Sequence, residues 1–282
     1  IEGDPSDTLA HRDDGFIQIA TRGKQEIYDT ILQAPCLGMH PDIMTPTMPG
    51  FYGLKDSHRS ARLICEPDAE IHAFQDRWIK PCALPGLING DTAFGNCVTS
   101  KHFQGFKVDQ KTRMNKVLDI LPQIGADFEN HFGRAGLAYF DAVGWPEDGV
   151  ADVAVVSMGP DFGTYESIRE EYDQSSGLKT AGLCVRLLSP FPREAVRERL
   201  KNAKVVVVVN QAHHQGRGHL TLDIADALCN LDSPPKIVSA FAGLGGANVS
   251  EATWEKILDS GRNVLKGGDP PPYQFFHEGM EL

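Results

Sequence analysis

The sequence lacks the cysteine patterns, apolar runs and leader peptide that assign many chains to a class at once. Six cysteines are scattered singly along its 282 residues, with no CxxC or CxxxC pair. They are Cys36, Cys65, Cys82, Cys97, Cys184 and Cys229. Because zinc ribbons and iron–sulfur clusters are held by such pairs, we predict reduced thiols and no metal site within this chain. No apolar run approaches the roughly eighteen residues of a membrane span, and no signal peptide is visible.

Phosphate-binding motifs and an excess of positive charge are missing as well. The sequence contains no GxGxxG, no P-loop and no GDG followed by an Asn pair, a pattern that holds a magnesium diphosphate. If the protein serves a phosphate-bearing cofactor, another polypeptide therefore has to hold the phosphates. The net charge of −11 argues against nucleic acid and anionic membranes as partners, since both bind clustered Lys and Arg. We expect a cytoplasmic protein.

The region from residue 178 to 216 has the most regular pattern in the chain. Residues 182–188 are mostly apolar and predict a strand, which the following Ser-Pro-Phe-Pro stops because proline fixes φ and removes a donor. A short helix follows, with Pro192 in its first turn. Residues 205–209, all valine, predict a strand buried on both faces of a parallel sheet. Function in such sheets lies just past the strand, here at residues 210–214.

Strand and helix patterns alternate through the rest of the sequence. Strands are predicted at residues 16–19, 43–54, 152–158 and 236–241, the last of them closing the series. Helices are predicted at residues 25–37, 109–132, 219–228 and around 253–258. A further helix is expected to be capped by Thr164 and to end at Gly177, and Ser250 is expected to cap the final helix. Pro122 is expected to break or kink the helix in which it lies.

Two segments have little periodicity. Prolines and glycines between residues 66 and 149 predict a long irregular connection, apart from the helix named above. The tail from residue 265 to 282 reads as extended, and we expect it to lie on another surface such as a partner subunit. The whole alternation predicts an α/β fold with a parallel, doubly wound sheet in its second half.

Four polar or glycine-rich motifs are candidates for metal, substrate, catalytic or dinucleotide sites. His213, His214 and His219 have no carboxylate or cysteine at ligand spacing, so a solvated loop is favoured over a metal site. Arg12 could bind a carboxylate substrate with both nitrogens, but an ion pair within a turn is the commoner outcome. Ser57-His58 has no GxSxG around it, which argues against a serine hydrolase. Gly243-Leu244-Gly245-Gly246 lacks dinucleotide-binding spacing and predicts a tight turn.

Three blocks of the sequence resemble the α subunit of ferredoxin-dependent 2-oxoacid oxidoreductases, the pyruvate:ferredoxin oxidoreductase group. They are residues 6–18 with 25–29, residues 46–58, and residues 182–192 (GLCVRLLSPFP) with 243–250 (GLGGANVS). The sequence departs from the family at Tyr52, where aspartate is usual, and at Leu54, where phenylalanine is usual. The resemblance begins in the middle of the family's first domain. The upstream part, which carries an activating glutamate and a substrate-binding arginine in the family, is therefore expected on a separate chain or missing from an incomplete subunit.

The resemblance implies both a fold and a function. It implies a partial thiamine-diphosphate-binding α/β domain over residues 1–85, a linker with a helix over 86–150, a transketolase C-terminal-like domain over 151–265 and an extended tail over 266–282. The family cleaves a 2-oxoacid on thiamine diphosphate with Mg²⁺ and passes electrons to ferredoxin. The diphosphate and the [4Fe–4S] clusters would then be held by partner subunits.

The resemblance also suggests where the site lies. It places Arg12, Asp13, Ser57 and His58 nearest the active site, with no catalytic role assigned to any of them. Two other functions remain open at this point. One is a thiamine-dependent transferase or dehydrogenase component without iron–sulfur partners, and the other is a non-catalytic assembly subunit.

Overall fold

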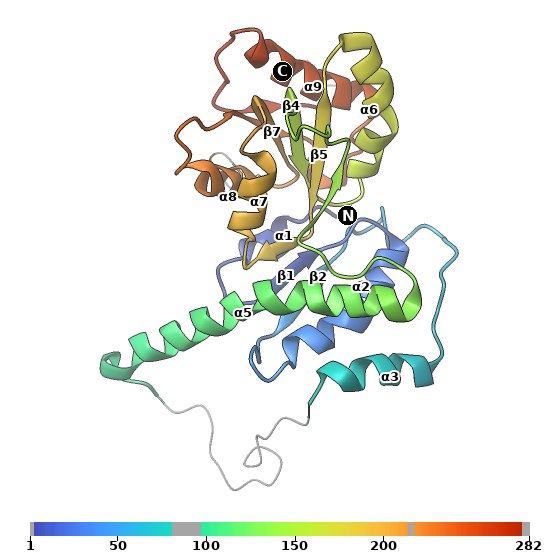
Figure 1. The fold of residues 1–282 in the computed structure, drawn as a ribbon, viewed down its shortest axis with the longest axis vertical. Coiled ribbons are helices and arrows are strands. Elements are labelled where there is room, and N and C mark those ends of the chain that lie inside the picture. The colour runs from blue at the N-terminus through green and yellow to red at the C-terminus, as the bar shows by residue number, and fades with distance from the viewer. Residues whose placement is uncertain (1–2, 81–96, 214–215, 217, 278–282) are drawn as a thin grey trace, which may run out of the picture.

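Two β-sheets, each with its own helices, form the fold of the computed structural model, which describes residues 3–80, 97–213, 216 and 218–277 (Figure 1). The first sheet has the strand order β2-β1-β6, and the second has the order β3-β5-β4-β7-β8-β9. The α/β class predicted from the sequence is therefore confirmed. None of the described helices is long and apolar enough to cross a membrane.

The first sheet is built on the predicted strand–helix–strand unit. β1 (Ile17–Ala20) pairs in parallel with β2 (Thr47–Gly50), and α2 (Lys24–Gly38) connects them. α1 (Ser6–Ala10) precedes β1. The third strand, β6 (Leu187–Ser189), pairs antiparallel with β1 although it lies far along the chain.

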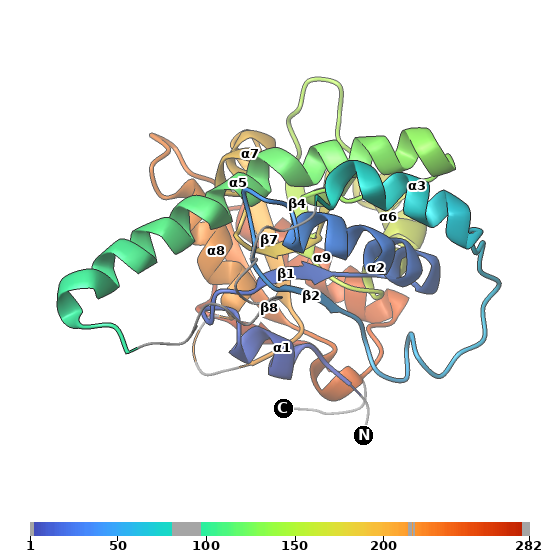
Figure 2. The ribbon, with the colours of Figure 1, turned by 90° about the horizontal axis from the view of Figure 1, so that it is seen from below.

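Two helices cover the first sheet together with α2 (Figure 2). α3 (Asp68–Trp78) was not predicted, because Phe74 is its one buried side chain and gives no apolar periodicity. The Phe74 ring packs at 5.4 Å from Phe128 of α5. α5 (Ser100–Phe132) begins before the predicted residue 109, because its first turns are exposed and carry no apolar stripe. Most of the prolines and glycines that predicted an irregular connection fall in 81–96, outside the described residues.

Of the predicted break or kink at Pro122, the break is wrong, because α5 continues through it, and the kink stays a prediction. Proline at this position cannot donate to the carbonyl of Leu118 one turn earlier. The hydroxyl of Tyr139, just before the second sheet begins, donates to that carbonyl instead. The polar group freed by the proline is therefore satisfied from outside the helix.

The second sheet is parallel except at one edge. Its strands are β3 (Phe140–Val143), β4 (Val153–Ser157), β5 (Thr180–Val185), β7 (Val205–Asn210), β8 (Lys236–Phe241) and β9 (Gln274–Phe275). β3 is antiparallel to β5, and the other pairs are parallel. Every residue of β4, β5 and β7 is buried, as their apolar runs predict.

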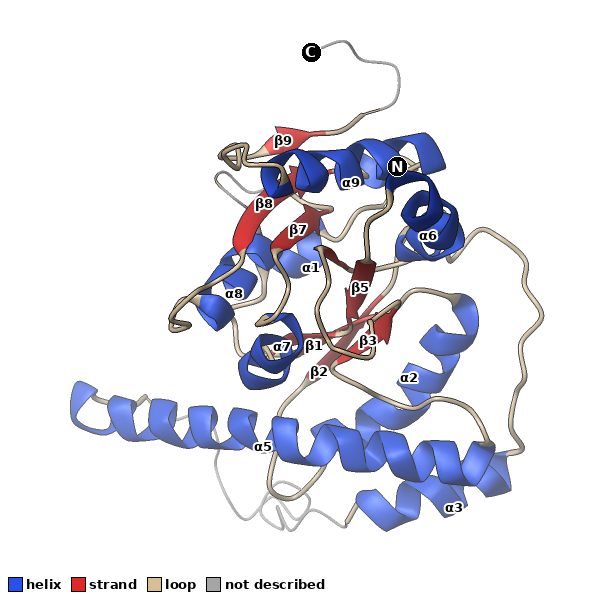
Figure 3. Ribbon diagram, turned by 45° about the horizontal axis from the view of Figure 1, so that its top comes forward, coloured by secondary structure: helices blue, strands red, loops and turns tan. Residues whose placement is uncertain are grey.

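Helices cover both faces of this sheet, as in a doubly wound fold (Figure 3). α6 (Phe162–Ser176) and α9 (Glu251–Leu265) pack on one face. α7 (Arg193–Leu200) and α8 (His219–Leu228) pack on the other. The tail returns to the same sheet, where β9 pairs with β8 and the Phe275 ring stacks 5.0 Å from Phe241. β8 is thus not the last strand.

The predicted helix ends are partly confirmed. Gly177 ends α6 with φ 72°, and the hydroxyl of Ser250 accepts from the backbone of Thr253 at the start of α9. Thr164 is not a cap, because α6 begins two residues earlier with Asp161 at the N-cap position. The side chain of Asp161 does not cap the helix either, since it is bound elsewhere.

The two sheets share one stretch of chain. β5 ends at Val185 in the second sheet, and β6 begins at Leu187 in the first. Arg186 between them accepts a backbone hydrogen bond from Ala20 at 2.7 Å and donates one to Tyr139 at 3.0 Å. Its side chain is 4% exposed and lies 2.9 Å from the Glu26 carboxylate of α2.

The Tyr139 contact to α5 gives a test by a double-mutant cycle. We expect Tyr139→Phe to lower the free energy of unfolding by about 1–2 kcal/mol, because the Leu118 carbonyl loses its donor. In a Pro122→Ala background the helix supplies that donor, so the same change should cost less than about 0.5 kcal/mol. Urea unfolding of the four proteins measures both costs. An equal cost in the two backgrounds would contradict this account.

Candidate functional site

The order of the parallel strands defines one crevice in which α/β folds commonly bind ligands. From β4 the chain passes through α6 to β5 on one side, and it later returns through α7 to β7 on the other side of β4. Ligands bind past the carboxyl ends of two strands at such a switch point. Here these ends are followed by Asp161 after β4 and by Gln211 after β7.

Side chains of the first half of the chain fill this crevice. The hydroxyl of Tyr52, which is 5% exposed, donates to the Gln211 amide oxygen. The amide nitrogen of Gln211 donates to Asp161 at 2.9 Å. The ammonium of Lys55 lies 2.7 and 2.9 Å from the two oxygens of Asp161, and 2.8 Å from the Ala247 carbonyl. We call Tyr52, Lys55, Asp161 and Gln211 the polar junction.

Burial is the largest influence on the pKa values of Tyr52 and Asp161 in the polar junction. It raises the pKa of the Tyr52 hydroxyl well above its ordinary value, and the nearby Asp161 carboxylate adds to the shift. Burial also raises the pKa of Asp161, although the Lys55 ammonium opposes it. The backbone leaves no spare room, because a Cβ at Gly159 would lie 2.4 Å from the Tyr52 ring. The side chains of Tyr52 and Lys55 therefore occupy the place where a ligand binds in many α/β folds.

The polar residues predicted just past β7 are structural in this arrangement. The Asn210 amide is buried and donates to the Thr221 hydroxyl at 2.8 Å. The His213 ring packs 4.9 Å from Phe241, and His214 lies outside the described residues. Among the residues that the structure describes, no three His, Cys, Asp or Glu side chains are grouped to hold a metal ion. The Gly243–Gly246 segment forms a tight turn, as predicted.

Arg12 forms an ion pair as predicted, but its partner lies on a distant helix and not within its own turn. Its guanidinium donates to both oxygens of Asp223 in α8, at 2.6 and 2.8 Å, and to the His219 carbonyl at 3.2 Å. The neighbouring Asp13 side chain is 95% exposed. Burial raises the pKa of Asp223 to about 6, although Arg12 opposes the shift.

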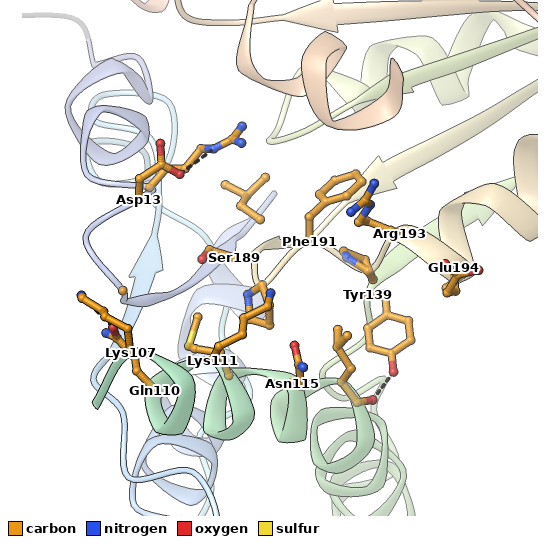
Figure 4. A pocket seen from close by; sticks show the side chains of 18 residues that line it. Asp13, Lys107, Gln110, Lys111, Asn115, Tyr139, Ser189, Phe191, Arg193 and Glu194 are labelled. Atoms are coloured by element: carbon orange, nitrogen blue, oxygen red, sulfur yellow. Dashed lines mark hydrogen bonds and ion pairs between the residues drawn. The ribbon is translucent and has the colours of Figure 1, made fainter. Parts of the chain in front are cut away.

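Arg12 and Asp13 line a cleft of about 680 Å³ that the sequence did not reveal (Figure 4). One wall is a face of α5 and the other is the segment from the end of β6 into α7. The α5 positions follow helical spacing, which was a usable signal. They are Lys107, Gln110, Lys111, Met114, Asn115 and Leu118. The opposite wall could not be placed beside them without knowing the packing of the two sheets.

Ser57 and His58 do not join this cleft. The Ser57 hydroxyl lies 2.8 Å from His58 Nδ1 and accepts from the Leu54 backbone at 3.2 Å. Both side chains are exposed in the turn that follows Tyr52 and Lys55 in the sequence. The structure therefore places Arg12 and Asp13 at the cleft and the Ser57–His58 pair away from it.

Comparison with known proteins identifies relatives along the whole chain. Residues 151–253 match the family model described as pyruvate:ferredoxin oxidoreductase core domain II. The chain is 26% identical over 287 residues to the pyruvate synthase subunit PorA of Methanosarcina barkeri, covering 100% of this chain and 69% of that relative. PorA of Thermotoga maritima is 28% identical over 264 residues, covering 93% and 66%. The alpha subunit of NADH-dependent phenylglyoxylate dehydrogenase of Aromatoleum evansii is 22% identical over 283 residues, covering 96% and 66%.

A solved structure has the same fold. The 2-oxoglutarate:ferredoxin oxidoreductase of Magnetococcus marinus superposes with a TM-score of 0.57 at 15% identity, covering 92% of this chain and 45% of that one. These matches confirm the resemblance seen in the motifs. The chain is similar to pyruvate synthase subunits PorA and to other oxidoreductase subunits, and it spans about two thirds of the length of these curated relatives.

The polar junction gives a stability test with a matched control. We expect Lys55→Met to lower the free energy of unfolding by about 3–5 kcal/mol, because it leaves the buried Asp161 without its counter-charge. Lys201→Met removes an exposed pair with Glu198 and should cost less than about 1 kcal/mol. Urea unfolding measures both. If the two variants lose similar stability, the junction does not hold the sheets together.

The raised pKa of Asp223 predicts a pH dependence of stability. Because an unfolded Asp titrates near pH ~4, the folded chain binds more protons than the unfolded chain between about pH 4 and 6. The free energy of unfolding therefore falls as the pH rises through this window and levels off above it. Relative to Asp223→Asn, we expect the free energy of unfolding of the native chain to fall by about 1–3 kcal/mol between pH 4 and 6.

Chemical unfolding at a series of pH values measures this difference. The exposed Asp232 provides the control, since Asp232→Asn removes one negative charge without touching Arg12. We subtract the free energy of unfolding of Asp223→Asn from that of the native chain at each pH. If this difference stays constant, or rises from pH 4 to 6, the raised pKa of Asp223 is contradicted.

Proposed function

We propose that this chain is one subunit of a thiamine diphosphate-dependent 2-oxoacid:ferredoxin oxidoreductase. Such a complex cleaves a 2-oxoacid oxidatively and passes the electrons to ferredoxin. The observation that carries the proposal is the similarity of the entire chain to named subunits of 2-oxoacid oxidoreductases, including pyruvate synthase and ketoisovalerate oxidoreductase. The presence of both GLCVRLLSPFP and GLGGANVS within the matched residues 151–253 supports it.

The polar junction supports a division of labour between this chain and its partners. The crevice that would hold a cofactor in many α/β proteins is closed by Tyr52 and Lys55. Thiamine diphosphate with Mg²⁺ and the [4Fe–4S] clusters are accordingly proposed to be held by partner subunits. Bound there, the cofactor supplies the carbanion chemistry, and this chain contributes the surface against which the site closes.

The exposed turns of the first half are the proposed contacts with that site. Ser57 and His58 are exposed side chains that a partner subunit can cover. Asp13 is equally accessible, whereas Arg12 is already bound to Asp223. We therefore propose that Arg12 positions the Asp13 turn and does not bind substrate itself.

The composition and activity of the native complex test this function. The affinity-tagged full chain is purified with its partner subunits, and iron, acid-labile sulfide and thiamine diphosphate are measured. We expect a brown complex that reduces ferredoxin or viologen with at least one 2-oxoacid of a panel. The isolated chain should turn over none, because its own crevice is filled.

Two outcomes would replace this proposal. A colourless complex that is active with 2-oxoacids would indicate a thiamine-dependent transferase or dehydrogenase component without clusters. A stable complex with no cofactor and no activity would indicate an assembly subunit. Strong activity from the isolated chain would contradict the division of labour.

A further inference from the structure

We propose that the cleft between α5 and the start of α7 binds a small organic anion with a flat apolar body. Its volume of about 680 Å³ lies within the range of roughly 300–1,000 Å³ typical of small-molecule sites. The walls come from three segments far apart in the sequence: the turn after α1, the middle of α5, and the passage from β6 into α7 (Figure 4). This site is separate from the polar junction, and the proposal does not depend on the proposed function.

Most charged side chains around the cleft are already neutralised by partners. Arg12 is bound to Asp223, as described above. Arg193 lies 2.5 Å from Asp226, and the Glu194 carboxylate is bound by Arg197 at 2.9 Å. These pairs leave little charge of Arg12, Arg193 and Glu194 for a ligand to recognise.

Two lysines on one face of α5 provide the remaining charge. Lys107 and Lys111 are one helical turn apart, and neither has a carboxylate partner among the described residues. The Lys107 ammonium donates to the Gln110 amide at 2.9 Å. The one other carboxylate of the lining, Asp13, extends into solvent. The cleft is therefore locally positive in a chain whose net charge is −11, which favours an anion over a cation.

Uncharged groups of the cleft favour a ligand with both polar and apolar parts. The Asn115 amide and the Ser189 hydroxyl have no side-chain hydrogen-bond partner among the described residues, and both line the cleft. The half-buried Phe191 ring and the Leu118 side chain offer flat and aliphatic surface beside them.

These groups fix the orientation of the ligand. The anionic end lies at Lys107 and Lys111, and the flat body lies against Phe191 and Leu118. A sulfonate, phosphate or carboxylate satisfies the charge equally well, so the chemistry of the head group is left to experiment.

The fluorescent dye 8-anilinonaphthalene-1-sulfonate is a probe with this chemistry. On the full chain we expect saturable binding that Lys107→Glu/Lys111→Glu weakens by about tenfold or more, a loss of ~1.4 kcal/mol. The neutral analogue N-phenyl-1-naphthylamine should be affected less than about twofold, since it has no charge to lose. Phe191→Ala should weaken both dyes, because the apolar body loses its surface. Inorganic pyrophosphate and pyruvate, added as competitors, separate phosphate from carboxylate preference.

A control on the same helix makes the result decisive. Lys101→Glu/Lys116→Glu changes the net charge equally, and neither side chain lines the cleft. Thermal unfolding of each variant first establishes that it is folded. The proposal is overturned if the control weakens the anionic dye as much as the cleft variant does. It is also overturned if the lysine changes affect the neutral dye equally, or if the folded native chain binds no anionic dye.

Discussion

The buried contact between Lys55 and Asp161 is the constraint on which the arrangement of the two sheets depends. The lysine comes from the loop after β2 and the aspartate from the loop after β4, so loss of either side chain would leave the other charge buried and unpaired between the sheets. An unpaired buried charge costs several kcal/mol, far more than an exposed ion pair contributes. Tyr52 and Gln211 complete the contact and exclude water from it. The polar junction therefore requires both sheets in their observed positions, beside the apolar packing of Leu9 and Ala20 against the second sheet.

This contact also fills the switch point of the second sheet with side chains of the same chain. The Tyr52 ring occupies the space left by Gly159. In many doubly wound proteins the carboxyl ends of such strands bind a ligand. Here the loops after β4 and β7 bind Tyr52 and Lys55 from the first half of the same chain. The accessible cavity lies on another side, between α5 and α7, and its polar groups come from helices and turns rather than strand ends.

Local sequence patterns predicted the parts of the fold that depend on local forces. The valines of β7 and the Ser250 cap are examples, since a β-branched run or a capping hydroxyl acts within a few residues. α3, the uninterrupted passage through Pro122, and β9 depend on distant partners and were missed. The candidate site was limited in the same way, because it too depends on contacts between distant parts of the chain. Arg12 and Asp13 were singled out, but the facing α5 and α7 surfaces, and the filling of the crevice by Tyr52, follow only from tertiary packing.

The passage from β5 to β6 has a consequence for how the molecule moves. Hinged enzymes open and close because a slack connection joins their two halves. Here the connection at Arg186 is extended chain with hydrogen bonds to both sides, and no slack residue lies within it. Any opening of the two halves about this connection would first have to break the backbone hydrogen bonds of Arg186 to Ala20 and to Tyr139.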